Sequence, residues 1–227
     1  MNSVRAFSIL RGVSNCLRRK NLVCVLVAGL GCGGQSHPAQ LPAPSPTVPL
    51  PTAGLASNHV PILPLTLVAA EDSLGWDGLL GDHHAALAAA DSILGLLLLA
   101  RAPEVTWVLP AELRRQARRS PTFAANPDQM ATALLRGEKF VDVPDPLRSE
   151  LRTLVALAGA RYALIPAALV YRRTTPPVPG TATAELSVVL VDARLGRVGW
   201  RTIARGEGSD PWTALTRAVK ALTPGLP

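Results

Sequence analysis

The sequence predicts an α/β domain in which helices pack on a mixed sheet of about five strands, after a disordered N-terminal signal and tether. Two observations favour this class. Branched apolar segments of strand length alternate with longer segments in which apolar residues recur every three or four positions. In addition, 227 residues with 48% hydrophobic content suit one domain with a sizeable core.

The first half of the domain is predicted to begin with a strand and a long helix. Residues 60–69 are apolar and branched, and their two prolines favour either a sheet edge or a late start of the strand. Asp82 is expected to cap a helix that runs toward Arg101. Asp91 interrupts its apolar run, which is too short for a membrane span. The side chains expected near its buried face are Ala85, Ala86, Ala89, Ile93, Leu96 and Leu97, and the run 96–99 is expected to be covered on several sides.

Proline, glycine and acidic residues divide the middle of the chain into short elements. Asp145 is expected to cap a helix with Pro146 in its first turn, and Gly159 ends that helix. The elements expected before it are a strand at 105–109, helices at 111–119 and 127–135, and an extended piece at 140–143.

The last third contains the most regular pattern. It predicts strands at 162–171, 183–192 and 198–208 and a closing helix at 211–222. In the turn between the second and third strands, Gly196 is expected to have positive φ and Asp192 to close the turn through its side chain. Trp200 is expected to pack across the sheet.

Two segments of this third resemble a known group of proteins. Residues 158–165 (AGARYALI) resemble a step from helix into strand, and residues 188–200 (VVLVDARLGRVGW) resemble a hairpin. Both recur in periplasmic domains similar to the TolB amino-terminal domain, CsgG and LpoB. The resemblance implies a non-catalytic part of envelope assembly or regulation. It does not extend to the pore that CsgG forms, because the sequence has no pair of amphipathic strands of membrane length.

Residues 1–31 have the parts of a bacterial export signal. The basic stretch 18–20 precedes an apolar run at 22–30, and the segment ends in Gly31-Cys32, which resembles a lipobox. Cys32 is therefore expected to carry lipid. Gly29 departs from the leucine that the lipobox prefers, so ordinary cleavage and secretion stay open as an alternative.

The composition of this signal explains two features of the whole chain. It carries 5 of the 23 basic residues and no acid, so 18 basic and 16 acidic residues follow it and the net charge falls from +7 to +2. All three cysteines, Cys16, Cys24 and Cys32, lie in it or at its end. We therefore expect no disulfide and no thiolate metal site in the domain. The predicted organisation is a signal at 1–31, a Pro/Ala/Ser-rich tether at 32–59, the α/β domain at 60–222 and a tail at 223–227.

One concentrated charge feature is a candidate binding site. Arg114, Arg115, Arg118 and Arg119 form a basic face on one predicted helix. It fits docking to an acidic protein or an anionic envelope polymer, and the alternative is a solvated face whose arginine stems cover apolar surface. No metal or cofactor is expected, since the adjacent His83 and His84 point to different faces of a helix. Nucleic acid is not expected either, because aromatic residues are few.

These observations predict an exported, non-enzymatic lipoprotein of the outer membrane or cell envelope that faces the periplasm. Its lipid anchor would bind the membrane, and its domain would bind an envelope protein. The alternative is a secreted small-molecule-binding or enzymatic domain, for which Asp72, Asp77 and Asp192 are the polar candidates by position. A surface lipoprotein without an assembly role is a third possibility.

Overall fold

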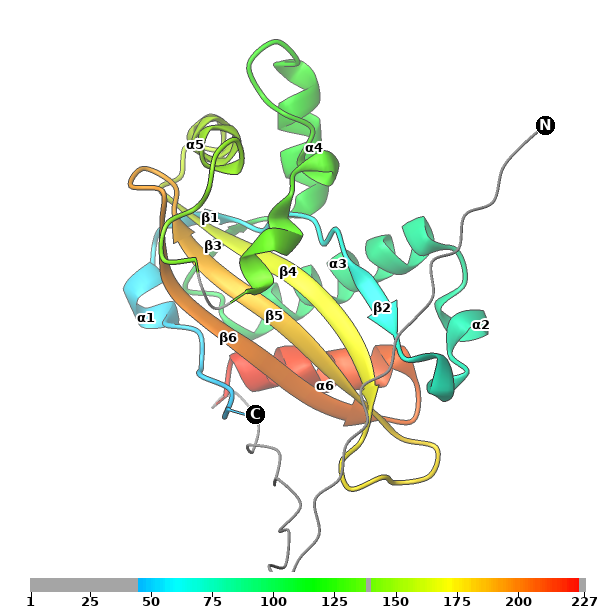
Figure 1. The fold of residues 1–227 in the computed structure, drawn as a ribbon. Helices are drawn as coiled ribbons and strands as arrows, with labels where there is room; N and C mark the ends of the chain where they lie inside the picture. The colour runs from blue at the N-terminus through cyan, green and yellow to red at the C-terminus, as the bar shows by residue number, and fades with distance from the viewer. Residues whose placement is uncertain (1–44, 138–139, 225–227) are drawn as a thin grey trace, which may run out of the picture. The chain divides into compact units, whose positions relative to one another are not determined.

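Three long antiparallel strands form the centre of the domain (Figure 1). The computed structural model describes residues 45–137 and 140–224. The three strands are β4 (Tyr162–Arg173), β5 (Ala182–Asp192) and β6 (Arg197–Gly208). They match the strands predicted from the sequence, and β5 lies between the other two.

Short parallel strands extend the sheet beyond β4. β2 (Val68–Ala70) pairs with β4, while β1 (His59–Pro61) pairs with β3 (Thr106–Val108) in a separate two-stranded sheet. The single strand predicted at 60–69 is thus wrong, because the chain makes two short strands there. Pro64 lies between them, and a proline has no N–H to donate to a sheet.

Helices cover both faces of the main sheet, which confirms the predicted fold class (Figure 1). α3 (His83–Arg101) and α6 (Pro211–Leu222) pack on one face. α4 (Pro110–Arg119) and α5 (Leu147–Leu157) belong to the core of the other face. The other short helical elements are α1 (Thr52–Leu55), η1 (Asp72–Leu74), α2 (Asp77–Leu80), η2 (Pro127–Gln129) and η3 (Thr132–Arg136).

Residues 45–59, at the end of the predicted tether, lie against the domain. The Val48 N–H donates to Thr202 Oγ1 at 2.7 Å, and the Leu50 N–H donates to the Leu222 carbonyl at 2.8 Å. The side chains of Leu50 and Leu55 are buried in the α3/α6 core. The signal, Cys32 and tether residues 32–44 lie outside the described residues.

α3 is rotated relative to the orientation expected from the sequence. Leu96 is 65% exposed and Leu99 is 41% exposed, so the expected cover over this end is wrong. Because the helix is apolar nearly all round, its periodicity does not specify which side faces the core. The residues that face inward are Ala86, Ala90, Asp91, Leu94, Gly95 and Leu98.

Of three local predictions in the middle of the chain, two are corrected. In place of one helix at 127–135 there are the two 3₁₀ turns η2 and η3, because Met130 between them is extended. Asp145 does not cap α5, since Pro146 precedes that helix and no side chain caps it. The extended piece predicted at 140–143 is confirmed, because Asp142 forms an isolated antiparallel bridge with Arg197 and the Val143 N–H donates to the Gly196 carbonyl at 2.8 Å.

Candidate docking face on α4

α4 separates its charged and apolar residues sharply. The helix begins at Pro110, a residue suited to a first helical position because it lacks the N–H that would be unsatisfied there. Leu113 and Ala117 point into the core between α4, α5 and the sheet. The predicted basic face occupies the rest of the helix, and the structure divides its four arginines into one inner and three outer side chains.

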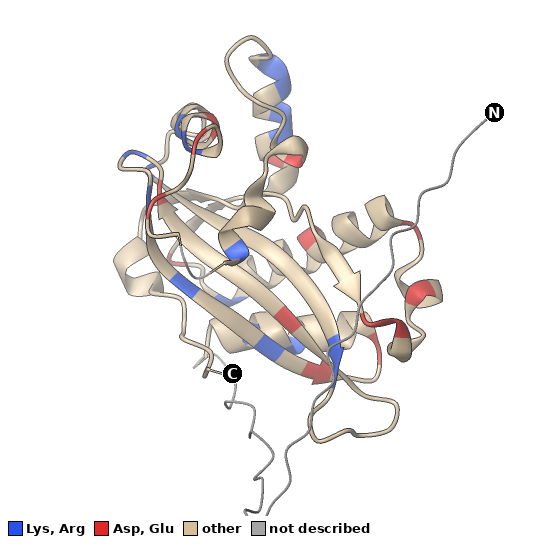
Figure 2. Cartoon of the chain, viewed as in Figure 1, with Lys and Arg blue, Asp and Glu red and all other residues tan. Residues whose placement is uncertain are grey.

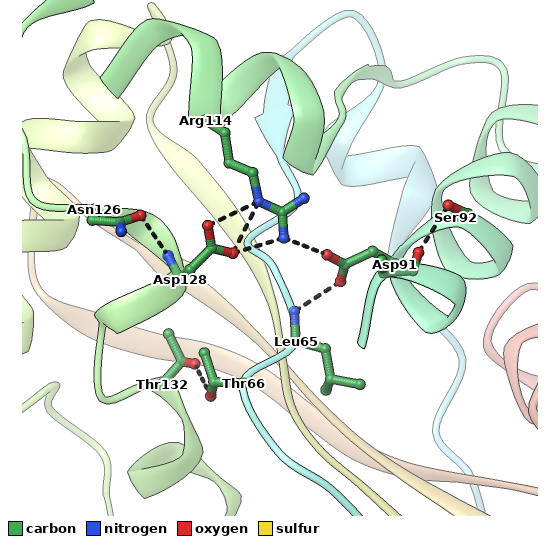
Figure 3. A network of polar contacts seen from close by, with 9 residues as sticks. Leu65, Thr66, Asp91, Ser92, Arg114, Asn126, Asp128 and Thr132 are labelled. Carbon is green, nitrogen blue, oxygen red and sulfur yellow. Dashed lines mark hydrogen bonds and ion pairs between the residues drawn. The ribbon is translucent and has the colours of Figure 1, made fainter. Parts of the chain in front are cut away.

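Arg114 is the inner arginine, and it joins three segments of the chain (Figure 3). Its Nη2 donates to Asp91 Oδ2 at 2.8 Å, across to α3. Its Nε donates to both carboxylate oxygens of Asp128, at 2.9 and 3.0 Å. Asp91 also accepts the Leu65 N–H on Oδ1 at 2.8 Å, so this carboxylate has a partner on each oxygen. Arg114 thus holds α4 in place.

The electrostatics of this network agree with a structural role. Asp91 is only 5% exposed, and burial raises its pKa above the ordinary value although Leu65 and Arg114 act in the opposite direction. The hydrogen bond to Asp128 is the largest of the effects that raise the pKa of Arg114. A buried carboxylate of this kind depends on its cation, so Arg114 is not available to a partner.

The other three arginines point outward. Arg115 forms an ion pair with Glu112 one turn earlier, and this contact lowers the pKa of Glu112. Arg118 and Arg119 are exposed, and neither forms an ion pair within residues 45–137 and 140–224, although the charge of Arg119 also helps to lower the pKa of Glu112. The structure thus brings three of the four predicted residues together on one solvent-facing surface, which we call the α4 face.

An exposed aromatic side chain follows the α4 face in the chain. Phe123 is 77% exposed in the loop after α4. A shallow hollow of about 330 Å³ lies near it, and its lining includes Arg118, Pro121 and Asn126. Arginine and aromatic side chains are enriched in protein interfaces. Sequence reasoning missed Phe123, although an aromatic residue within a polar, proline-flanked loop was the signal available.

Charge is distributed unevenly over the described domain. Residues 45–100 contain no lysine or arginine and carry five acids, four of them between Glu71 and Asp82. Figure 2 shows basic residues on α4 and α5 and acidic residues around η1 and α2. The three outward arginines of the α4 face would attract an approaching acidic surface.

Asp192, a polar candidate from the sequence, closes the β5–β6 hairpin as predicted. It accepts the Leu195 N–H at 3.0 Å and Arg161 Nε at 2.9 Å. Burial raises the pKa of Asp192, but Arg161 and the Leu195 N–H outweigh it and leave the pKa lowered. Gly196 has the expected positive φ of 70°, and Trp200 packs against the α3/α6 core. The carboxylate is thus engaged in structural contacts.

The remaining candidates do not converge on a common site. Asp72 and Asp77 lie in the first turns of η1 and α2, and His83 and His84 lie exposed at the start of α3. Within the described ranges, no three side chains of the metal-binding types are grouped together. A hollow of about 570 Å³ at the far end of the sheet contains Arg172 and Arg205, but both are paired with Glu185.

No family model matches the chain, and no curated protein matches its sequence. Among solved structures, a point variant of the PelC dodecamer from Paraburkholderia phytofirmans matches with 14% identity and a TM-score of 0.35, over 79% of this chain and 94% of that one. The LpoB C-terminal domain from Escherichia coli matches with 14% identity and a TM-score of 0.36, over 66% and 83%. Lipoprotein GNA1162 from Neisseria meningitidis matches with 15% identity and a TM-score of 0.28, over 65% and 78%.

LpoB, one of the proteins that residues 158–165 and 188–200 resemble, and lipoprotein GNA1162 are thus among the structures matched. All the TM-scores given are below 0.5. These matches therefore assign no activity and no partner to this chain.

Proposed function

We propose that this chain is a non-catalytic, membrane-tethered lipoprotein of the bacterial cell envelope. Its α/β domain would bind a protein partner in envelope assembly, secretion or cell-wall regulation. The observation that carries the proposal is the signal-like segment that ends at Cys32, followed by a proline-rich stretch before the domain. All other cysteines precede Cys32, so a thiol would be retained after processing only at the proposed anchor.

The proposed binding surface is the α4 face together with Phe123. Arg115, Arg118 and Arg119 are exposed, with Arg115 also paired to Glu112, whereas Arg114 is engaged with Asp91 and Asp128. Three guanidinium groups favour an acidic partner, and the exposed Phe123, four residues after Arg119 in the chain, supplies apolar area that a partner would cover. The proposed partner is therefore an acidic envelope protein.

The polar groups of the domain favour a binding role over an enzymatic one. Catalytic acids and bases need a perturbed carboxylate or imidazole that opens into a cleft. Asp91 has a raised pKa, but both of its oxygens already accept hydrogen bonds from Leu65 and Arg114. Asp192 is likewise occupied by Arg161 and Leu195. Hydrolase or transferase activity in the purified chain, lost in a variant of either carboxylate, would contradict this proposal.

Metabolic labelling with a palmitate analogue tests the anchor. The wild-type chain is expected to take up label, and Cys32→Ser is expected to lose it. Cys16→Ser and Cys24→Ser are the matched controls, because they remove thiols upstream of the proposed cleavage and should label like wild type. An unlabelled wild-type chain would show that it carries no such lipid.

Photo-crosslinking from the α4 face tests the partner. A crosslinking side chain at position 115 or 119 is expected to capture one acidic envelope protein, and the same group at position 217 on α6 serves as the control. Arg118→Ala combined with Arg119→Ala is expected to abolish capture from position 115. If these variants capture as wild type does, the α4 face is only a solvated surface.

A further inference from the structure

The outward side of α3 is a second exposed surface, with a chemistry opposite to that of the α4 face. It carries no charged side chain between His84 and Arg101, whereas an exposed helix ordinarily presents charged residues to water. Leu96 is 65% exposed and Leu99 is 41% exposed. By length and composition, α3 is the one helix in the described part of the chain that could cross a membrane, so the expectation that its apolar run is too short is wrong; its inward residues, Asp91 among them, nevertheless pack inside the domain. The residues along its outermost line are Ala85, Ala88, Ser92, Leu96 and Leu99.

The one polar side chain on this line has already satisfied its donor. Ser92 Oγ donates to the Ala88 carbonyl at 2.8 Å within the helix. Covering the line with another apolar surface would therefore leave no unpaired donor on Ser92. This removes the usual cost of burying a hydroxyl, so the whole line from Ala85 to Leu99 is fit for burial.

The sizes of these side chains make the line complementary to itself. Leu96 lies four residues after Ser92 and Ala88 four residues before it, while Leu99 lies seven after and Ala85 seven before. In two antiparallel copies related by a two-fold axis at Ser92, each leucine of one copy faces an alanine of the other. Large side chains opposite small ones interdigitate and allow a close approach of helices.

We propose that α3 is a homodimerisation surface, on which a second copy of this chain packs antiparallel about a two-fold axis at Ser92. The contact is isologous, so it closes at two copies and needs no other partner. Its residues 85–99 span about 21 Å at 1.5 Å per residue, which is short for a stable interface. The dimer is therefore weak in free solution.

Tethering to one membrane strengthens such a dimer. Two anchored copies share a thin layer of volume, and the resulting effective concentration favours weak contacts between them. This strengthening rests on the proposed lipid anchor, whereas the pairing of the helices does not. The α4 face lies on the other side of the sheet, so the two surfaces are free to bind different partners.

Disulfide trapping in the full chain tests the two-fold axis. Ser92→Cys places the new thiol opposite its own copy, so mild oxidation is expected to give a covalent dimer. Ser149→Cys on α5, where the serine is also exposed, is the matched control and is expected to stay monomeric. The wild-type chain measures any background from Cys16, Cys24 or Cys32.

A size swap distinguishes helix pairing from a general loss of folding. In the Ser92→Cys background, Ala88→Leu is expected to clash with Leu96 of the other copy and to lower trapping at least fivefold. Leu96→Ala leaves a gap and is expected to lower it about as much. The double variant restores the large-to-small pairing with the roles exchanged, and trapping is expected to return.

Three outcomes would overturn the proposal. They are an absence of the Ser92→Cys dimer, equal trapping through Ser149→Cys, and a double variant no better than its parents. If Ser92→Cys stays monomeric and vesicles of phosphatidylglycerol shield its thiol from maleimide, α3 lies on lipid instead. In a chain that carries both Ser92→Cys and Cys32→Ser, disulfide trapping at high protein concentration would support the pairing of α3 without any lipid anchor. The dimer proposal and the anchor proposal can therefore fail independently.

Discussion

The two faces of the central sheet are held to their helices in different ways. On the α3/α6 face, α6 approaches β6 so closely that backbone meets backbone at Gly206 and Gly208. On the other face, α4 and α5 contact the sheet through side chains, and the Asp91–Arg114–Asp128 network ties α4 to α3 and η2. The α3/α6 face thus requires glycine at positions 206 and 208. The other face requires the guanidinium group of Arg114.

The outer surfaces of these two layers differ as strongly. α3 presents Leu96, Leu99 and small residues, whereas α4 presents Arg115, Arg118 and Arg119. An apolar surface associates through buried area, and a basic one through complementary charge that salt screens. If both proposed surfaces bind, added salt should weaken association through the α4 face and should not weaken association through α3.

The largest expected effect comes from disrupting the close contact between α6 and β6 on the α3/α6 face. A Cβ at position 206 would lie 2.2 Å from the Ala218 backbone nitrogen and 2.5 Å from the Ala214 carbonyl oxygen. Because neither backbone atom can move alone, Gly206→Ala must push α6 away from the sheet. We expect it to cost about 3 kcal/mol or more of the free energy of unfolding, measured by urea denaturation.

Gly199→Ala is the matched control on the same strand. Its Cβ would find no atom closer than the Leu190 carbonyl oxygen at 3.9 Å, an ordinary contact. This variant is expected to change the free energy of unfolding by less than about 0.5 kcal/mol. Equal losses from the two substitutions would mean that strand propensity, and not the helix contact, decides the result.

The next largest effect is expected from disrupting the Asp91–Arg114–Asp128 network. Arg114→Ala leaves the Asp91 carboxylate, which is 5% exposed, without its cation. Removing one partner of a buried ion pair lowers the free energy of unfolding by several kcal/mol. Because Arg114 is 26% exposed, we expect a loss at the lower end of that range, about 3 kcal/mol. Urea denaturation at neutral pH measures the loss.

Arg118→Ala, one turn along the same helix, is the control for Arg114→Ala. It removes an equal charge from an exposed position and is expected to stay within about 0.5 kcal/mol of wild type. Adding Asp91→Asn to Arg114→Ala should recover part of the loss, because asparagine carries no charge and still accepts the Leu65 N–H. A double variant that is less stable than Arg114→Ala would contradict the account of an uncompensated carboxylate.

Local signals account for what the sequence predicted well. The helix at Pro211–Leu222 and the cap of α3 by Asp82 were predictable because proline and capping residues act on their own first turn. The hairpin around Gly196 was predictable for the same reason, since its φ of 70° and the Asp192 contact involve neighbours in sequence.

Tertiary contacts account for what the sequence did not predict. The rotation of α3 depends on Asp91, which faces inward only because Arg114 and Leu65 are there to pair with it. That pairing also removes Arg114 from the predicted docking face. Four nearby arginines look alike in sequence, and only the folded chain distinguishes the one beside a buried carboxylate from the three in solvent.

The smallest expected effect concerns the cap of α6, the helix in closest contact with the sheet. Asp210 accepts the Trp212 N–H at 3.1 Å and the Thr213 N–H at 2.9 Å. Asp210→Ala is expected to cost about 1 kcal/mol at pH 7. Asp82→Ala at α3, where one N–H is accepted at 3.1 Å, is the matched control and should cost less.

The loss in Asp210→Ala should also depend on pH. Hydrogen bonds from Thr213 hold the pKa of Asp210 below its ordinary value, so the unfolded chain takes up this proton before the folded one does. The cap therefore stabilises the fold above the unfolded pKa and loses this contribution as pH falls through the folded pKa. Urea denaturation at pH 7, 5 and 3 should give similar deficits at the first two values and a smaller one at the third. A deficit that stays constant down to pH 3 would mean that the ionised carboxylate is not what caps α6.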